Sequence, residues 1–324
     1  MKKKTVYIWM SMMVVLSAAL FTGITFLDLG PTLKPIVAAA NPVGGEPEFK
    51  QSIYGSFESP LNKPMDVAKI GEFIYISDTG NKQVQVFDQS GTQISSFGKE
   101  GSKEGEFEFP YGITGDKQGN IYVADLYNGT ISIFDSKGKF IKYFQEQTDQ
   151  EKVIKAPGGL RIYNEKLYVT DIKANKLFVF NLEGKKLLEI GEAGSDNAQF
   201  IAPNAVAVDK GQNIYVTDSG NNRVQVFDKK GEFLKIINGS EDGKGAPTFL
   251  NPRGIAVDSA GTVYVVNNLS HNIYAFDKEG NQVQELGGMG TDNGKLYLPN
   301  GMYMDERGTI FVTDTINKRI SVFY

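Results

Sequence analysis

Acidic and amide side chains recur at a nearly constant interval along this chain. The six positions lie 47, 46, 47, 49 and 47 residues apart, and each follows a run of β-forming residues: Asp78, Asp125, Asp171, Asp218, Asn267 and Asp314. A row of carboxylates could bind a divalent cation or exchange protons with a substrate. A functional site needs exceptions to a repeat, however, and these residues repeat almost without change. The pattern therefore favours a structural role in which each side chain caps its own turn.

A second set of positions varies from one repeat to the next and is the better candidate for a binding site. Each repeat contains a proline upstream of its acidic residue, and the candidates directly follow five of the six prolines: Met65, Tyr111, Asn204, Arg253 and Asn300. The third repeat has a glycine there. The first two side chains are apolar or aromatic, and the other three are polar or cationic. Because arginine presents a planar fork to carboxylates and phosphates, the set predicts a ligand with an apolar end and an anionic or hydrogen-bonding end.

Three further residues depart from the repeat. Asp66 stands where the other repeats have glycine or alanine, and pairing with Arg253 is its simplest structural role. Arg161 and Tyr303 replace small residues in the third and sixth repeats, which would face each other across a six-fold ring. A charged arginine there needs a partner or channel water. We expect both of these to be structural.

The composition excludes several catalytic classes. The chain has no cysteine, and His271 is its single histidine. Disulfides, thiolate zinc sites and catalytic cysteines are thus excluded, and a Ser-His-Asp triad or a multi-histidine metal site is almost excluded. Acidic residues between the repeats lack the spacing of a known calcium loop. We therefore predict no catalytic residue, no metal site and no cofactor.

The elements that position these residues are short strands. In the fourth repeat, four β-rich segments are separated by turns: 206–208, 214–217, 223–227 and 233–237. Four short antiparallel strands at a period near 47 residues describe a propeller blade, and six repeats give six blades. The innermost strands begin after the prolines, so the candidate residues should line the mouth of the central channel.

The two ends of the repeat region predict how the ring closes. The sixth repeat stops at Tyr324, directly after its third strand. The segment Gln51–Phe57 precedes the first repeat and resembles fourth strands such as Gln93–Phe97. We predict that it completes blade six and pairs the edge that would otherwise be exposed.

The N-terminus predicts a membrane segment. Lys2–Lys4 precede an uncharged run, Thr5–Leu27, whose 23 residues would span about 35 Å as a helix. The basic end should stay in the cytoplasm, which places the remainder outside. A retained single-pass anchor is favoured over secretion after Ala40, because that small-residue site lies far beyond the apolar run. The predicted organisation is an anchor segment (1–40), a linker (41–50) and a propeller (51–324).

The charge of the remaining chain argues against nucleic-acid binding. Residues 1–40 hold four lysines and one aspartate, so the rest carries 30 basic and 37 acidic residues, a net charge of −7. A nucleic-acid partner normally requires a basic surface.

The repeat itself resembles a known family. The segment Asp218–Asp228 (DSGNNRVQVFD) and the approach Gly98–Gly112 are similar to the NHL repeat, and the likeness covers roughly residues 51–324. The chain is identified as a member of the NHL-repeat six-bladed β-propeller family, and as a bacterial, extracytoplasmic member. The resemblance implies an all-β fold but no single function, because the family spans many.

Propellers related to this family include enzymes: an amidating lyase, gluconolactonase-like lactonases and streptogramin lyases. The first would need several histidine zinc ligands. A calcium lactonase would need acidic and amide ligands in the channel, where Asp66, Asn204 and Asn300 are the candidates.

We therefore predict a membrane-anchored, extracytoplasmic propeller that binds a protein, peptide or small ligand at its loop-rich face. Its membrane contact would be the N-terminal helix, and nucleic acid is not expected as a partner. The alternative is a propeller enzyme of lyase or lactonase type with a site at the channel mouth.

Overall fold

The computed structural model describes residues 47–145, 153–239 and 248–324. The predicted membrane segment Thr5–Leu27, the cleavage site after Ala40 and most of the linker 41–50 lie outside these ranges. Within the described ranges, no helix has the length and apolar character needed to cross a bilayer.

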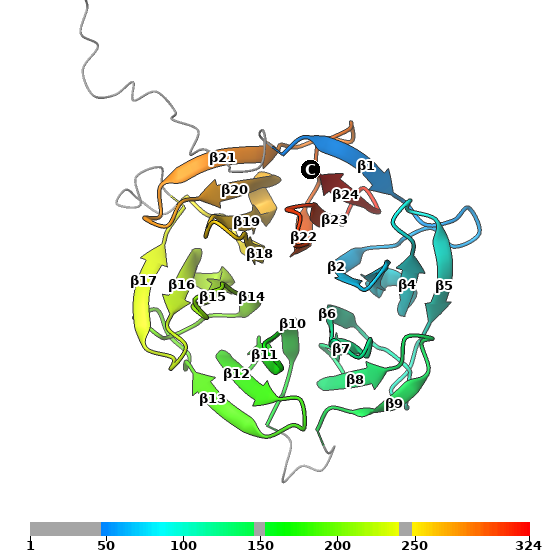
Figure 1. Ribbon diagram of the computed structural model, residues 1–324, viewed down its shortest axis with the longest axis horizontal. Coiled ribbons are helices and arrows are strands. Elements are labelled where there is room, and N and C mark those ends of the chain that lie inside the picture. Colours follow the sequence, from blue (N-terminus) through cyan, green and yellow to red (C-terminus); the bar gives the residue numbers. More distant parts are fainter. Residues whose placement is uncertain (1–46, 146–152, 240–247) are drawn as a thin grey trace, which may run out of the picture. The chain divides into compact units, whose positions relative to one another are not determined.

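The described residues form six four-stranded antiparallel sheets arranged around a central axis (Figure 1). From the axis outward, blade one contains β2 (Pro64–Ile70), β3 (Phe73–Asp78), β4 (Gln83–Phe87) and β5 (Gln93–Phe97). Blade two contains β6 (Pro110–Gly115), β7 (Ile121–Asp125), β8 (Thr130–Phe134) and β9 (Phe140–Tyr143). Blade three contains β10 (Pro157–Tyr163), β11 (Lys166–Asp171), β12 (Lys176–Asn181) and β13 (Lys186–Ile190). Blades four and five contain β14 (Pro203–Val208), β15 (Ile214–Asp218), β16 (Arg223–Phe227) and β17 (Phe233–Ile237); β18 (Pro252–Val257), β19 (Val263–Asn267), β20 (Asn272–Phe276) and β21 (Gln282–Gly287).

Blade six is built from both ends of the described chain. Its strands are β22 (Pro299–Met304), β23 (Ile310–Asp314), β24 (Arg319–Phe323) and, outermost, β1 (Phe49–Ile53). β1 runs antiparallel to β24 with Phe49 opposite Phe323 and Ile53 opposite Ile320, which confirms the predicted closure. The strand ends earlier than the predicted Phe57, because Gly55 has a positive φ of 87° and turns the backbone out of the extended region.

Regular secondary structure other than strands is confined, in the described ranges, to three 3₁₀ turns. These are η1 (Thr79–Asn81), η2 (Ser219–Asn221) and η3 (Asn268–Ser270), each between the second and third strands of a blade. The predicted all-β, six-bladed fold is therefore confirmed for this part of the chain.

The hydrophobic core is divided among the spaces between neighbouring blades. Six clusters of buried side chains each combine residues of two adjacent blades, including the pair formed by blades six and one. A phenylalanine lies at the end of the third strand, or one residue before it in blade three, and is almost fully buried in every blade: Phe87, Phe134, Phe180, Phe227, Phe276 and Phe323. The recurrent phenylalanine of the sequence is thus a packing residue, and no blade buries its faces without its neighbours.

Around the axis, the innermost strands approach one another so closely that side chains are excluded. A Cβ on Gly112 would lie 2.2 Å from the carbonyl oxygen of Gly158 in the next blade, and one on Gly301 would lie 2.3 Å from Oδ1 of Asp66. Real Cβ atoms do not make such contacts, so these positions require glycine. This explains why small residues follow the variable mouth position in five of the six blades.

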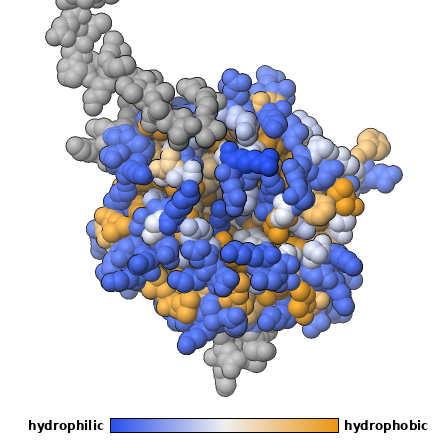
Figure 2. All heavy atoms as spheres, viewed as in Figure 1, coloured by the Kyte–Doolittle hydropathy of each residue, from blue (hydrophilic) through white to orange (hydrophobic). Residues whose placement is uncertain are grey.

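The ring has two different faces. The innermost strands begin, and the second strands end, on the face that also carries the middle turns and the loops between blades, which we call the loop-rich face. The turns between the third and fourth strands lie on the opposite, lower face, where Glu48 and Tyr324 exchange two backbone hydrogen bonds of 2.9 Å. Figure 2 shows one face of the molecule, on which hydrophilic side chains predominate and apolar patches lie between them.

Closure by β1 predicts a large effect of Ile53→Ala. Ile53 is 1% exposed and packs among Ile320, Val322 and Leu61 between blades six and one. Its truncation should lower the free energy of unfolding by about 2–5 kcal/mol in urea denaturation. The control is Ile94→Ala on the outer strand β5, where the side chain is 54% exposed and the change should stay within about 0.5 kcal/mol. Equal effects of the two substitutions would contradict the closure.

Candidate functional site

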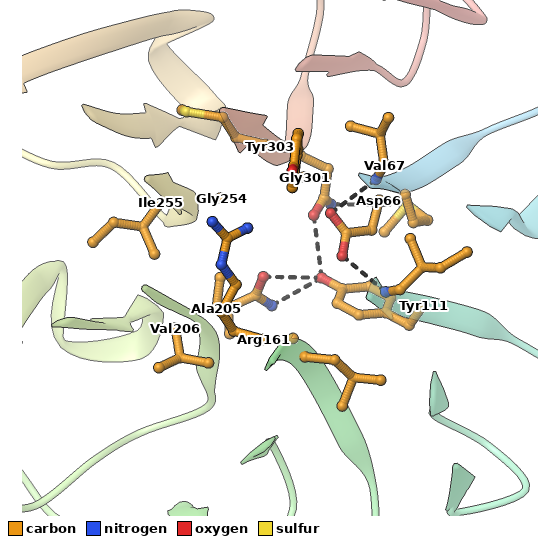
Figure 3. A pocket seen from close by; sticks show the side chains of 17 residues that line it. Asp66, Val67, Tyr111, Arg161, Ala205, Val206, Gly254, Ile255, Gly301 and Tyr303 are labelled. Carbon is orange, nitrogen blue, oxygen red and sulfur yellow. Dashed lines mark hydrogen bonds between the residues drawn. The ribbon is translucent and has the colours of Figure 1, made fainter. Parts of the chain in front are cut away.

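Four of the five predicted mouth residues meet at one hydroxyl group, that of Tyr111, which Figure 3 labels. The Tyr111 ring, at the start of β6 in blade two, reaches across the axis to blades four, five and six. Its hydroxyl oxygen accepts hydrogen bonds from Asn204 Nδ2 (2.8 Å) and Arg253 Nη1 (3.2 Å). The same hydroxyl lies within donating distance of Oδ1 of Asn204 (3.1 Å) and of Asn300 (3.2 Å). We call these four residues the Tyr111 cluster.

The Tyr111 cluster lies across the channel on the side of the loop-rich face. The side chains of Tyr111, Asn204 and Asn300 are buried, and Met65 completes the group with its sulfur 3.8 Å from Asn300 Nδ2. The apolar or aromatic residues Met65 and Tyr111 therefore contact the polar residues of the predicted set across the axis. Ligand binding by these five residues stays a prediction.

Arg253 retains hydrogen-bonding capacity after this contact. Its Nε is buried and has no hydrogen-bond partner among the described residues. A buried donor on a charged group is energetically costly to leave unpaired. The guanidinium is therefore the member of the cluster best able to gain from an additional acceptor.

Beneath the cluster lies a narrow cavity on the axis. Its volume is about 30 Å³, room for about two water molecules. All six innermost strands contribute to its wall, and the polar side chains that line it below the Tyr111 cluster are those of Asp66, Arg161 and Tyr303. Figure 3 shows the three residues entering from three different strands.

Asp66 is held by backbone groups and does not pair with Arg253, so the simplest expectation from the sequence is wrong. Its carboxylate oxygens accept hydrogen bonds from the backbone N–H of Val67 (2.9 Å) and of Ile113 in the next blade (3.0 Å). Burial raises the pKa of Asp66 to about 7, although the two backbone bonds and the charge of Arg161 act in the opposite direction. The residue keeps some surface toward the channel, but a passage this narrow solvates a carboxylate poorly.

Arg161 and Tyr303 meet across the channel as their opposed blades predict. The Arg161 guanidinium carbon lies 5.1 Å from the centroid of the Tyr303 ring, a cation–π geometry. Burial raises the pKa of Tyr303, and the Arg161 charge opposes that shift. The sequence identified both exceptions but not that they contact each other.

The recurrent acidic residues are structural, as predicted, but their main role differs from the prediction. Each carboxylate or amide oxygen accepts a hydrogen bond from a backbone N–H in the loop that leads into its own blade, as in Asp78 with Asn62 (2.7 Å) and Asp314 with Tyr297 (2.6 Å). The side chain of Asp78 makes no capping hydrogen bond to its own turn. Asp125 and Asp171 do cap the turns that follow them, because each accepts hydrogen bonds from two backbone N–H groups of its turn.

The two recurrent arginines strengthen this arrangement. Arg223 Nε lies 2.8 Å from Asp218 Oδ2, and Arg319 Nε lies 2.8 Å from Asp314 Oδ2. Both guanidinium groups also donate to carbonyl oxygens of the inter-blade loops. The recurrent acidic and arginine residues of the repeat thus hold the inter-blade loops in place and do not form a catalytic site.

The residues that a calcium lactonase would need do not fit a cation here. The Asn204 and Asn300 oxygens face the Tyr111 hydroxyl, and the Asp66 oxygens accept backbone N–H groups. Over the described ranges, no group of three histidine, cysteine or acidic side chains could hold a metal. His271 lies in the turn after β19, where its Nδ1 accepts a hydrogen bond from the Leu298 N–H (2.9 Å), which agrees with a structural role.

Comparison with known proteins agrees with the fold. The NHL repeat family matches residues 200–227, the segment that contains Asp218 and Arg223. The chain contains an NHL repeat within a six-bladed propeller. Solved structures similar to this propeller over 85–86% of the chain include a streptogramin B lyase (14% identity, TM-score 0.58, 98% of that chain) and a gluconolactonase from Xanthomonas campestris (14%, 0.63, 95%). A third is a catalytically inactive histidine-to-alanine variant of virginiamycin B lyase from Staphylococcus aureus with quinupristin (14%, 0.60, 99%). At these identities the likeness shows the propeller fold alone.

The Tyr111 cluster predicts that Tyr111→Phe destabilises the ring. The substitution removes the hydroxyl and leaves the buried amides of Asn204 and Asn300 without their common partner. The free energy of unfolding should fall by about 1–3 kcal/mol in urea denaturation. Tyr127→Phe, on an exposed ring, is the control and should have no measurable effect. A Tyr111→Phe protein as stable as the wild type would show that the hydroxyl does not hold the cluster together.

The raised pKa of Asp66 predicts a pH dependence of stability. Between pH values of about 4 and 7, the carboxyl group is protonated in the folded state and ionised in the unfolded state, so rising pH favours unfolding. Relative to Asp66→Asn, the wild-type free energy of unfolding should fall by about 1.4 kcal/mol per pH unit in this window and level off above it. Parallel pH profiles of the two proteins, measured by chemical denaturation, would contradict the shift.

Proposed function

We propose that this chain is a membrane-anchored, extracytoplasmic binding module that recognises a protein, peptide or small ligand at its loop-rich face. The observation that carries the proposal is the Tyr111 cluster. Tyr111, Asn204 and Asn300 are buried against one another, whereas Arg253 stays partly exposed and keeps an unpaired Nε, so a partner approaching this face would meet Arg253. Such a surface suits recognition, which needs convergent polar groups but no reacting ones.

The path of the chain supports an accessible loop-rich face. β1 begins at Phe49 on the lower face, beside the C-terminal Tyr324. A tether that runs from a membrane segment at Thr5–Leu27 into β1 therefore joins the propeller on the face opposite the proposed binding surface. The loop-rich face would be free to meet partners away from the point of attachment.

The proposed location has a direct test. With Lys2–Lys4 in the cytoplasm, protease added to intact protoplasts should digest the propeller. Protection until the cells are lysed would refute the orientation. A mature protein that begins at Asn41 would leave the orientation standing but would replace the anchor by secretion.

An enzyme of lyase or lactonase type is the second candidate, and Asp66 is the observation that favours it. A buried carboxyl group whose pKa lies near 7 is suited to general acid–base work, and it shares a cavity with the Arg161 charge. The structural likeness to a streptogramin lyase and a gluconolactonase supports the same idea. A cavity of about 30 Å³ is too small for such substrates, however, so this reading also requires the Tyr111 cluster to open. Hydrolysis of a sugar lactone that is lost in Asp66→Asn would favour it.

Arg253 gives the test of the binding proposal. In pull-downs with the full-length protein in detergent micelles, Arg253→Ala should weaken binding of the recovered partner about tenfold or more, since a charge-assisted contact contributes roughly 1.5–3 kcal/mol. Arg253→Lys keeps the charge but not the fork, and should recover part of the loss.

Control substitutions for Arg253 lie on the lower face. Lys229 and Lys230 occupy the turn between β16 and β17, and replacing both by alanine should do little. Loss of binding in this control, with binding retained by Arg253→Ala, would place the site elsewhere.

A further inference from the structure

Exposed aliphatic side chains gather on the loop-rich face over blades four to six. Ile201 and Leu250 lie in the loops that lead into blades four and five, and Leu269 and Ile316 lie in the middle turns of blades five and six. All four are between 43% and 55% exposed. We call these four residues the apolar arc.

Exposed lysines lie on the same face over blades one and three. Lys63 directly precedes β2, and Lys155 is separated from β10 by one residue. Lys173 lies in the middle turn of blade three. We call these three residues the lysine arc. Residues 41–324 carry a net charge of −7, so a group of exposed cations around the mouth is a local departure from the charge of the domain.

The two arcs are held on a fixed scaffold. In each blade a backbone hydrogen bond joins the inter-blade loop to the middle turn, as from Leu269 N–H to Leu250 O (3.2 Å) and from Ile172 N–H to Ala156 O (3.0 Å). The buried acidic residues bind the same loops from below, for example Asp171 with the Lys155 N–H (2.6 Å). A partner would thus not have to order the loops that present these side chains, which lowers the entropic cost of binding.

Other side chains border the mouth between the two arcs. Tyr127 of blade two adds an exposed aromatic ring, and Lys318 of blade six adds a cation beside the apolar arc. The acidic residue next to the mouth in blade two, Glu108, is half-buried. Other exposed acidic residues of the described inter-blade loops lie earlier in those loops, nearer to the preceding outer strands: Glu58, Glu100, Glu104, Glu192, Asp196 and Asp292. Among the described residues that directly border the innermost strands and in the middle turns, the exposed groups are mainly apolar or cationic.

We propose that the loop-rich face binds an acidic segment of another protein, with apolar side chains on the apolar arc and carboxylates on the lysine arc. The inference rests on the proposed binding function and names the chemistry of its partner. Charge complementarity with Lys63, Lys155 and Lys173 selects an acidic chain, and the size and spread of the apolar arc select one that also carries aliphatic or aromatic side chains. The chain enters β1 from the lower face, so the proposed N-terminal anchor would hold that face toward the membrane, which favours a protein over the membrane surface as the occupant.

The test uses a library of short random peptides, displayed on phage and selected on the full-length protein in detergent micelles. Selected peptides should combine acidic with apolar residues. A synthetic copy should bind at least about tenfold more weakly to Lys155→Glu/Lys173→Glu and to Leu250→Ser/Leu269→Ser, and more weakly as salt is raised. Each variant changes exposed side chains, and circular dichroism and thermal unfolding verify its fold.

Matched controls carry the same changes elsewhere on the ring. These are Lys229→Glu/Lys230→Glu on the lower face and Ile94→Ser/Leu234→Ser on the outer strands, and peptide affinity should stay within about twofold.

Three outcomes would overturn the proposal. Selected peptides that are basic or uncharged, yet depend on Arg253 or on either arc, would refute the acidic partner and leave the binding function standing. Vesicles of anionic phospholipid that bind through the same arcs, with no peptide selected, would identify a membrane surface instead. Peptides that respond only to the control substitutions would remove both the proposal and the binding function on which it rests.

Discussion

The rest of the structure depends on how closely the innermost strands of neighbouring blades approach one another around the axis. At Gly112 and Gly301 the next blade leaves no space for a single methyl group. This contact fixes the radius of the ring, and with it the distance over which a side chain must reach to touch the opposite wall. A tyrosine can cross that distance, which is why Tyr111 meets three other blades. Asp66 occupies in blade one the position that Gly112 and Gly301 occupy in theirs, and its carboxylate is enclosed because the strands approach so closely.

Buried polar groups hold the loops on this frame. Five aspartates and Asn267 each bind the loop that leads into their own blade, and two of them are paired with arginine. A buried carboxylate is stable only when its oxygens are satisfied, and the loop N–H groups need acceptors in turn. The same bonds fix the described loop ends that lead into the innermost strands, where the exposed lysines and aliphatic side chains of the two arcs lie.

Much of the fold follows from sequence periodicity, because each blade repeats the same order of proline, β-forming segments, acidic or amide residue and phenylalanine. The prolines predicted the starts of the innermost strands, and the missing fourth strand after Phe323 predicted that residues near 51 would close the ring. The site was predicted less completely. Spacing placed Tyr111, Asn204 and Arg253 at the mouth, but the position of one hydroxyl between three blades depends on side-chain reach across the axis. The pairing of Asp66 with backbone N–H groups, in place of Arg253, depends on the same geometry, which a repeat cannot encode.

The pairing of β1 with β24 has a consequence for how the protein is made. β1 is among the first parts of the propeller to be synthesised, and its partner β24 is the last. Until the ribosome has completed residues 319–323, the cluster that contains Ile53, Ile320 and Val322 cannot form, and the nascent chain carries open strand edges and exposed apolar surface. A chain that stops a few residues early would therefore differ from the native protein by a whole blade junction. The interval between the emergence of the first strand and the arrival of the last is the period in which the unfinished ring is open to aggregation and proteolysis.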